Sequence, residues 1–347
     1  MTPHPLGIHR SLDPPGTLPQ TARKLDAAPR ALENEIAVAV RALNVDAASF
    51  RQLRETERAT GETVARQILR IVAERGKMQN PVTGSGGIFL GDVREVGPKH
   101  PAAGDLRPGE RIASLVSLTL TPLAIDRIHA VVAASDRVEL DGTAILFERT
   151  LWARMPGDFP EEVALAAFDV AGAPASVLRR AKTGQTIVVI GTGKAGLLCL
   201  AAGREAVGPS GRVLAIDPSE AASGRARGLG YADDVLTLDA RNPVAVQSAI
   251  RDATKGDMAH LVVNAVNAPG TEMATVLAAK DDGTALFFGM ATSFSAAALG
   301  AEGAAHPGTL LIGNGYVPGH AETALGLLRR HARLASVFAG LAGVPTP

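Results

Sequence analysis

From about residue 150 onward, short apolar runs alternate with helical stretches, and this alternation constrains the fold more than any other feature of the sequence. The apolar runs are continuous, which is typical of parallel strands that helices cover on both faces. The pattern predicts an α/β domain built on a doubly wound parallel sheet. The expected strands are TIVVIGTG (186–193), RVLAID (212–217), DVLTL (234–238), LVVNAV (261–266), TALFFGM (284–290) and TLLIGNG (309–315).

A glycine-rich loop follows the first of these strands, fits G-x-G-x-x-G, and leads into a predicted helix. In this motif the first glycine permits a tight turn, the second lets the backbone approach a pyrophosphate, and the third allows close helix–strand packing. The free N–H groups of the following helix favour the phosphates. The loop therefore predicts a dinucleotide site; a turn in a flavodoxin-like or methyl-transfer domain is the alternative. The expected cofactor-binding residues are Gly191, Thr192, Gly193, Lys194, Ala195 and Gly196.

An acidic residue, Asp217, ends the second expected strand, 21 residues after Gly196. A carboxylate there would accept hydrogen bonds from the adenosine ribose and repel a 2′-phosphate, which favours NAD over NADP. Arg225 and Arg227 lie close enough in the sequence to keep NADP open. Residues that end later strands at the same sheet edge are predicted to line the nicotinamide ribose; they are Asn264, Asn267 and Gly289.

The first half of the chain has a different texture, with apparent strands separated by Pro and Gly turns. Strands are expected over 35–45, 87–97 and 110–118, and a charged helical insert over 49–75. The last 30 residues are expected to form one helix. The predicted domains are a β-rich N-terminal domain over 1–150, a dinucleotide-binding domain over 151–318, and a helical tail over 319–347.

Charge and composition exclude several classes of protein. The 35 Lys and Arg balance 35 Asp and Glu, and only 3% of residues are aromatic, so nothing drives binding to nucleic acid or to an anionic membrane. No apolar stretch approaches the about 20 residues of a spanning helix, and the first residues lack a signal peptide's apolar core. The one cysteine, Cys199, is expected to be a buried, inert thiol. We expect a cytoplasmic protein acting on a small molecule, with no nucleic-acid or membrane partner.

The segment PVTGSGGIFLGDVREVGP (81–98) and the order of the two domains resemble the medium-chain dehydrogenase/reductase superfamily. This resemblance implies a GroES-like β-rich N-terminal domain followed by a Rossmann domain. It also identifies the regions that normally supply zinc ligands, and here they read Ser85, LNVDAASF (43–50) without cysteine, and Phe168 with Asp169. Because catalytic zinc needs about three protein ligands, we predict that the chain binds no zinc or other metal.

Further segments resemble the L-erythro-3,5-diaminohexanoate dehydrogenase family more closely, and ERGKMQNPVTGSGG (74–87) is the most specific of them. The resemblance implies NAD(P)-dependent oxidative deamination of 3,5-diaminohexanoate to 5-amino-3-oxohexanoate, with release of ammonia. The resemblance to the superfamily suggests a homodimer. The other segments are IHRSLDPPGTLPQTA (8–22), LNVDAASF (43–50), SLVSLTLTPLAI (114–125), AILFE (144–148) and ALAAFDVAGAPA (164–175).

A substrate with two ammonium groups and one carboxylate requires acids, a base and a cation in its pocket. Asp169 is the first choice for the catalytic carboxylate, and Glu148 and Asp46 are the other candidates. Arg75 and Lys77 are expected to bind the substrate carboxylate. The predicted hydrogen-bond donors to the substrate are Asn80, Thr83 and Ser85.

Two other functions are compatible with a dinucleotide domain. A zinc-independent quinone or enone reductase of the same superfamily would prefer NADPH and have an apolar pocket, which Asp217 and the nearby acids disfavour. A non-enzymatic dinucleotide-binding protein would bind the cofactor tightly without turnover.

Overall fold

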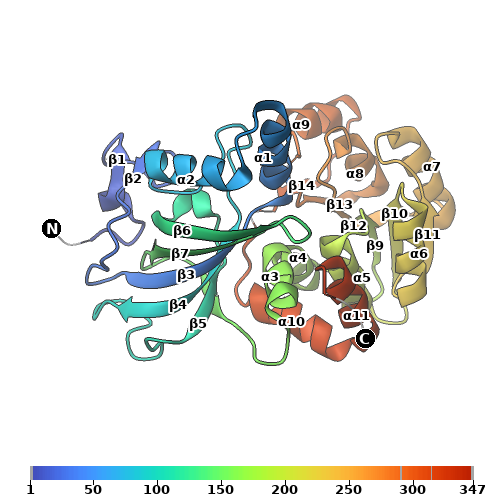
Figure 1. Ribbon diagram of the computed structural model, residues 1–347. Helices are drawn as coiled ribbons and strands as arrows, with labels where there is room; N and C mark the ends of the chain where they lie inside the picture. Colours follow the sequence, from blue (N-terminus) through green and yellow to red (C-terminus); the bar gives the residue numbers. More distant parts are fainter. Residues whose placement is uncertain (1–2, 290, 314, 345–347) are drawn as a thin grey trace. The chain divides into compact units, whose positions relative to one another are not determined.

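The computed structural model describes residues 3–289, 291–313 and 315–344. It divides the chain into two compact units, residues 1–165 and 166–347, which are described separately below (Figure 1). The sequence places a boundary near 150. Strand β8 (Trp152–Arg154) pairs with the sheet of the first unit, and so the first unit extends further. Met290, which ends one expected strand, Asn314, which lies in another, and residues 345–347 of the expected tail lie outside the described residues.

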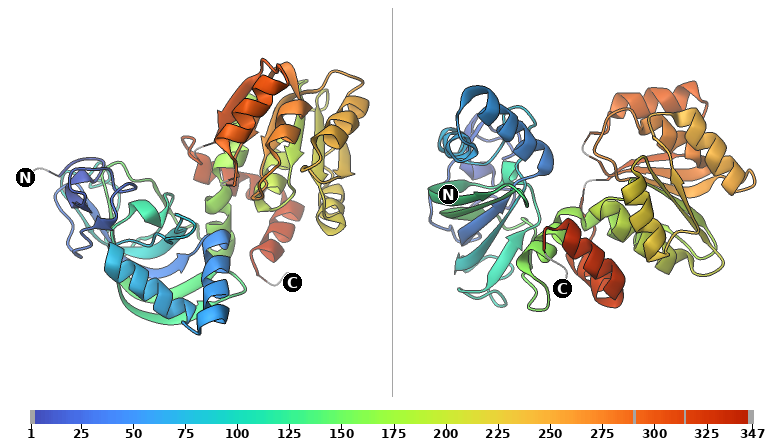
Figure 2. Two further views of the ribbon diagram at one scale, coloured as in Figure 1. Left: turned by 90° about the horizontal axis from the view of Figure 1, so that it is seen from above. Right: turned by 45° about the vertical axis from the view of Figure 1, so that its right-hand side comes forward.

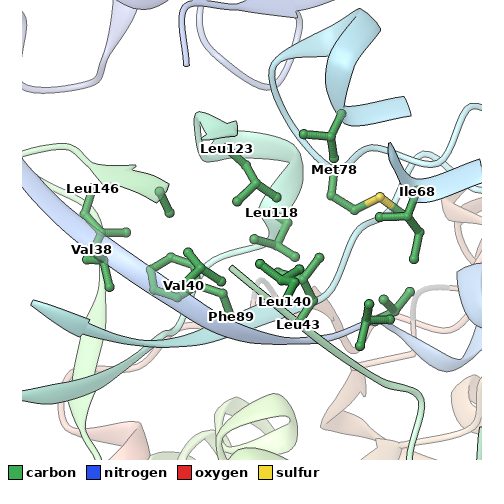
Figure 3. Packing of buried hydrophobic residues seen from close by; sticks show 14 of the residues in the cluster. Val38, Val40, Leu43, Ile68, Met78, Phe89, Leu118, Leu123, Leu140 and Leu146 are labelled. Carbon is green, nitrogen blue, oxygen red and sulfur yellow. The ribbon is translucent and has the colours of Figure 1, made fainter. Parts of the chain in front are cut away.

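The first unit is built on a six-stranded antiparallel sheet with the order β6-β7-β3-β4-β5-β8. Its central strands confirm the expected strands, although the third is shorter than predicted. Apolar side chains from these strands, together with Ile68 and Met78, form its core (Figure 3). The strands are β3 (Ile36–Asn44), β4 (Ile88–Val96), β5 (Arg111–Ser114), β6 (Leu123–Val132), β7 (Arg137–Leu146) and β8.

The helical insert expected over 49–75 is confirmed, and it consists of two helices, α1 (Ala47–Thr60) and α2 (Val64–Arg75). Gly61 ends α1 in the left-handed conformation, with φ of 76°, and its N–H donates to the carbonyl of Glu57. Thr63 then caps α2, because its hydroxyl accepts from the N–H of Arg66.

A buried ion pair fastens the N-terminal segment, which includes β1 (Ser11–Asp13) and β2 (Lys24–Leu25), to the start of β3. Nε and Nη2 of Arg10 donate to the two carboxylate oxygens of Glu35 at 2.7 and 2.6 Å. Nε2 of His9 lies 2.8 Å from the same carboxylate, which also accepts from the N–H of Leu32 at 2.8 Å. Glu35 is fully buried, so the pair is shielded from solvent.

The second unit has a six-stranded parallel sheet with the order β11-β10-β9-β12-β13-β14, which confirms the doubly wound α/β domain. The strand order reverses between β9 and β12, and ligands of such sheets bind outside the carboxyl ends of the strands at this point. The strands are β9 (Thr186–Ile190), β10 (Arg212–Asp217), β11 (Asp234–Thr237), β12 (Ala259–Asn264), β13 (Ala279–Phe287) and β14 (Thr309–Ile312).

Helices lie against both faces of the parallel sheet (Figure 2). Apolar residues of α7 and α8 pack with Val188 and Ile190 on one face, whereas α5 lies close to Ile187 on the other. The alternation of neighbouring residues between two covered faces explains the continuous apolar runs. The helices are α4 (Gly172–Arg180), α5 (Lys194–Val207), α6 (Glu220–Leu229), α7 (Pro243–Ala253), α8 (Glu272–Ala278) and α9 (Phe294–Gly303).

The C-terminal residues form α10 (His320–Arg330) and α11 (Ala332–Leu341), and the single helix expected there is wrong. His331 separates them, because its φ of −123° and ψ of 79° are not helical. Cys199 is buried in α5, as expected, and its burial raises the pKa of the thiol. Among the described helices, none has the length and hydropathy that a membrane crossing requires.

Candidate functional site

The glycine loop of the second unit has the geometry that its motif predicts. Gly191 has a φ of +90°, and a Cβ there would lie 2.8 Å from Cγ2 of Val266. A Cβ on Gly196 would overlap the carbonyl oxygen of Gly191, so both glycines are required for a compact turn. A Cβ on Gly193 would meet no atom within 4 Å, and Gly193, at the N-cap of α5, has no side chain to cap that helix. This open face at the N-terminus of α5 fits a pyrophosphate.

Asp217 is fixed beside this loop. Its Oδ2 accepts from the N–H of Thr192 at 2.8 Å and from the Thr192 hydroxyl at 3.0 Å, and its Oδ1 accepts from the N–H of Ser219 at 2.9 Å. Arg227 is engaged elsewhere, because it donates to Glu220 at 2.7 Å. The C-terminal end of β10 therefore carries the acidic side chain of Asp217. Arg227, on α6, is held in an ion pair with Glu220.

Asn264, at the end of β12, builds the loop that follows it. Its side-chain amide donates to the hydroxyls of Thr271 and Thr275 at 2.9 and 2.8 Å, and its Oδ1 accepts from the N–H of Val266 at 3.0 Å. Asn264 is buried, and these bonds occupy both ends of its amide. Asn264 therefore holds the loop after β12 in its conformation, and Asn267 is exposed in the same loop.

In the first unit, polar residues gather around the first turn of α1. Asp46 caps this helix, with Oδ1 accepting from the N–H of Ser49 at 3.0 Å. Its other oxygen, Oδ2, is shielded from solvent and has no hydrogen-bond partner within the described part of the chain. The Ser49 hydroxyl lies 2.5 Å from that of Thr83. The structure thus brings two predicted site residues together through Ser49, which the sequence did not single out.

Hydrogen bonds of Asn80 hold part of the segment ERGKMQNPVTGSGG (74–87) against the first turns of α1. Its Oδ1 accepts from the N–H of Val82 at 2.8 Å, and its Nδ2 donates to Oε1 of Gln52 in α1 at 2.8 Å. The Asn80 N–H donates to the carbonyl of Ser85, which closes the loop. These bonds link polar residues of α1 with residues of the segment 80–85. The residues are Asp46, Ser49, Asn80, Thr83 and Ser85.

The remaining predicted residues lie elsewhere. Arg75 is half-buried at the end of α2 and donates to Gln79 at 3.2 Å. Glu148, after β7, accepts from Nδ2 of Asn34 at 2.9 Å. Asp169 is exposed near the end of α3 (Glu161–Val170). Across the described ranges, no three side chains of His, Cys, Asp or Glu gather as the ligands of a metal ion would.

Lys77 is fully buried, and its Nζ donates to the carbonyl of Pro19 at 2.7 Å. Burial, together with the charge of Arg75, lowers the pKa of Lys77 from 10.5 to about 8. The Lys77 ammonium thus holds the N-terminal segment, and recognition of a substrate carboxylate would depend on Arg75.

The free energy of unfolding is expected to rise with pH because Lys77 loses its proton at a lower pH in the folded unit than in the unfolded chain. Below about pH 8 the ammonium group of Lys77 is charged and buried in the folded unit. Between pH 8 and 10.5 Lys77 carries its proton only in the unfolded chain. The free energy of unfolding should therefore rise by about 2–3 kcal/mol across this range, relative to Lys77→Met. Urea unfolding at pH 7 to 10.5 measures it, with the exposed Lys24→Met as control; a wild-type curve parallel to that of Lys77→Met would contradict the expectation.

Replacing Gly193 with Val is expected to block the dinucleotide site without unfolding the protein. The side chain has open space in the free protein but would meet an incoming pyrophosphate, an overlap that typically costs about 1–3 kcal/mol. NAD affinity should fall about 10- to 100-fold. Gly224→Val on α6, where the space is equally open, is the control. Calorimetric titration that finds wild-type NAD affinity in Gly193→Val would remove the loop from the site.

The chain is similar to known proteins over almost its whole length. A family model described as the L-erythro-3,5-diaminohexanoate dehydrogenase N-terminal domain matches residues 9–156. Proteins named L-erythro-3,5-diaminohexanoate dehydrogenase from Acetoanaerobium sticklandii and Fusobacterium nucleatum are each 44% identical to it over 333 residues, 96% of this chain and 97% and 96% of theirs.

Solved structures of lower similarity confirm the fold. An alcohol dehydrogenase from Thermotoga maritima is 16% identical, with a TM-score of 0.56 over 89% of this chain and 86% of its own. A mycobacterial protein complexed with NADPH is 20% identical, with a TM-score of 0.53 over 93% and 86%. Such distant likenesses establish the fold alone, whereas the 44% identity of the two relatives establishes the family. The chain belongs to the L-erythro-3,5-diaminohexanoate dehydrogenase family.

Proposed function

We propose that this chain catalyses the NAD-dependent oxidative deamination of L-erythro-3,5-diaminohexanoate to 5-amino-3-oxohexanoate and ammonia. The observation that carries the proposal is the 44% identity, over 96% of the chain, to two proteins named for this dehydrogenase activity. The glycine loop and Asp217 support it, because they fit a dinucleotide.

The overall reaction defines what the protein must do. The C3 ammonium loses a proton and C3 loses a hydride, water adds to the resulting imine, and ammonia leaves as the C3 carbonyl forms. When bound, the nicotinamide supplies the hydride acceptor. The chain must therefore orient C3, accept a proton from the ammonium, and return one to the departing ammonia.

We assign the proton acceptor to Oδ2 of Asp46. A shielded carboxylate oxygen without a partner in the described residues is uncommon in folded proteins and calls for a functional explanation, and a substrate ammonium would supply the missing donor. Thr83 and Ser85, beside it, would hold the substrate by hydrogen bonds. Glu148 is bound by Asn34 before the start of β3, whereas Asp46 follows the end of that strand, so Glu148 lies too far from Asp46 to share one small substrate with it. We therefore propose Asp169 as the partner of the second ammonium and Arg75 as the partner of the carboxylate.

We propose NAD as the cofactor. Asp217 is held at the end of β10, where its charge would repel a 2′-phosphate, and Arg227 is engaged by Glu220. We also propose that no metal takes part, because Asp46, Ser85 and Phe168 stand in the regions that supply zinc ligands in the superfamily, and phenylalanine has no atom that binds zinc.

One spectrophotometric comparison tests the proposed function. Formation of reduced nicotinamide is followed with L-erythro-3,5-diaminohexanoate and NAD or NADP, and its consumption with quinones and NADPH. Turnover of the diamino acid with NAD is expected. Quinone reduction without diamino acid turnover would instead identify a quinone reductase, and tight cofactor binding without any turnover would identify a non-enzymatic binding protein.

A homodimer is the proposed assembly. The support is strand β14, which pairs with β13 on one side only among the described strands and ends in the 53% exposed Ile312. Sedimentation equilibrium is expected to give twice the mass of 35.7 kDa. A monomer at that mass would contradict this assembly.

A further inference from the structure

A buried carboxylate, Glu272, lies at the carboxyl edge of the parallel sheet, and no step above uses it. It is the first residue of α8 and is 3% exposed. Its Oε1 accepts from the N–H of Ser293 at 2.8 Å, and its Oε2 accepts from the N–H of Gly270 at 3.1 Å. Both oxygens therefore bind backbone amides, one in the loop after β12 and one in the loop after β13.

These two loops and the glycine loop are packed closely together at Gly289 and Gly191. A Cβ on Gly289, after β13, would overlap the carbonyl oxygen of Val266, after β12. Val266 in turn lies against Gly191, and the N–H of Ala265 donates to the carbonyl of Ile190 at 2.9 Å. A shift of the loop after β13 would therefore change the surface that it forms with the loop after β12.

The strand order places the two halves of a dinucleotide over different loops. Asp217, at the end of β10, fixes the adenosine side, and the pyrophosphate lies over the glycine loop after β9. The nicotinamide half then extends to the other side of β9, over the ends of β12 and β13. The loops that Glu272 joins are therefore those beneath the nicotinamide.

We propose that Glu272 is a positioning residue for the nicotinamide half of the cofactor, an inference that rests on the proposed function. Glu272 does not itself reach the ligand, because it is buried and both of its oxygens accept from the chain. It acts by holding Ser293 and Gly270 at a fixed separation. The two hydrogen-bond partners of Glu272 lie in the loops after β12 and β13, and not at the end of β10, where the adenosine half of the dinucleotide would bind.

The isosteric change Glu272→Gln tests this proposal. Glutamine keeps the shape but has one acceptor oxygen, so its NH₂ group would face one of the two backbone N–H groups. A buried N–H left without an acceptor typically weakens the arrangement about tenfold or more. We expect the dissociation constant for NAD, measured by calorimetric titration, to rise about tenfold, while that for ADP stays within about twofold of wild type.

Two controls and one further variant make the result specific. Glu302→Gln, at an exposed position on α9, should leave the affinities for both ligands unchanged. Asp217→Asn should weaken NAD and ADP together. Glu272→Asp, which keeps the charge but cannot span both amides, should reproduce the selective loss if Glu272→Gln does not fold.

The possible outcomes separate the inference from the proposed function. Wild-type NAD affinity in Glu272→Gln would overturn the inference and leave the function intact. Equal weakening of NAD and ADP would also overturn it, since it would show general loosening of the unit. Failure of the wild-type protein to bind NAD, NADP or ADP would instead overturn the proposed function.

Discussion

Replacing Asp46 with Asn is expected to lower kcat for 3,5-diaminohexanoate by about 10²–10⁴-fold, the usual contribution of a general base. The variant should fold normally, because asparagine caps helices as well as aspartate does and keeps an oxygen for the Ser49 N–H, which Oδ1 of Asp46 now accepts at 3.0 Å. The substitution therefore removes the proton acceptor at Oδ2 while preserving the cap. Steady-state kinetics and thermal unfolding measure the two effects.

A second variant distinguishes loss of the base from a disturbed helix. Asp46→Ala should lower kcat by about the same factor as Asp46→Asn and should also lose about 1 kcal/mol of stability, because it removes the cap. If Asp46→Asn retains kcat within about twofold, the acceptor lies elsewhere, and Asp169 is the next carboxylate to replace.

Replacing Glu35 with Gln is expected to give the largest loss of stability, about 3–5 kcal/mol, because the buried Arg10 guanidinium loses the charged partner at 2.6 Å and keeps as counter-charge the 46% exposed Asp26, at 3.8 Å. The midpoint of urea unfolding measures this. Glu220→Gln is the matched control, since its ion pair with Arg227 is exposed and should contribute little to stability. Equal effects of the two substitutions would show that the buried pair does not fasten the N-terminal segment.

The same carboxylate predicts a dependence on acid. Burial alone would raise the pKa of Glu35, but hydrogen bonds from His9, Arg10 and the Leu32 N–H, together with the Arg10 charge, lower it from 4.5 to about 2. A lowered pKa stabilises the folded state above pH 4.5, and this stability is lost as the pH falls toward 2. The free energy of unfolding of Glu35→Gln should therefore depend less on pH between 4.5 and 2 than that of the wild-type protein.

The second unit could be predicted from the sequence almost completely, because its signals are local. A continuous apolar run, a glycine loop and an acid at the end of the next strand each lie within a few residues. The fold follows from their order along the chain. The loop glycines Gly191 and Gly196 are required by the close approach of the backbone that the motif itself encodes.

The polar contacts of the site could not be predicted in this way, because they join residues far apart in the sequence. Lys77 resembles a surface ligand for a carboxylate, yet it donates to the carbonyl of Pro19, 58 residues away. Ser49 gains its place from Thr83, and Glu272 from Ser293. The two-helix insert is different: Gly61 is a helix-ending signal that the sequence does contain.

The central claim is that the chain oxidises a diamino acid at nitrogen-bearing C3 without a metal. It is tested most directly by measuring NADH and ammonia formed from L-erythro-3,5-diaminohexanoate and NAD by protein dialysed against a strong chelator and verified metal-free by elemental analysis. The account predicts undiminished turnover with one ammonia released for each NADH formed. Activity that disappears on chelation and returns with zinc, or NADH formed without ammonia, would contradict it.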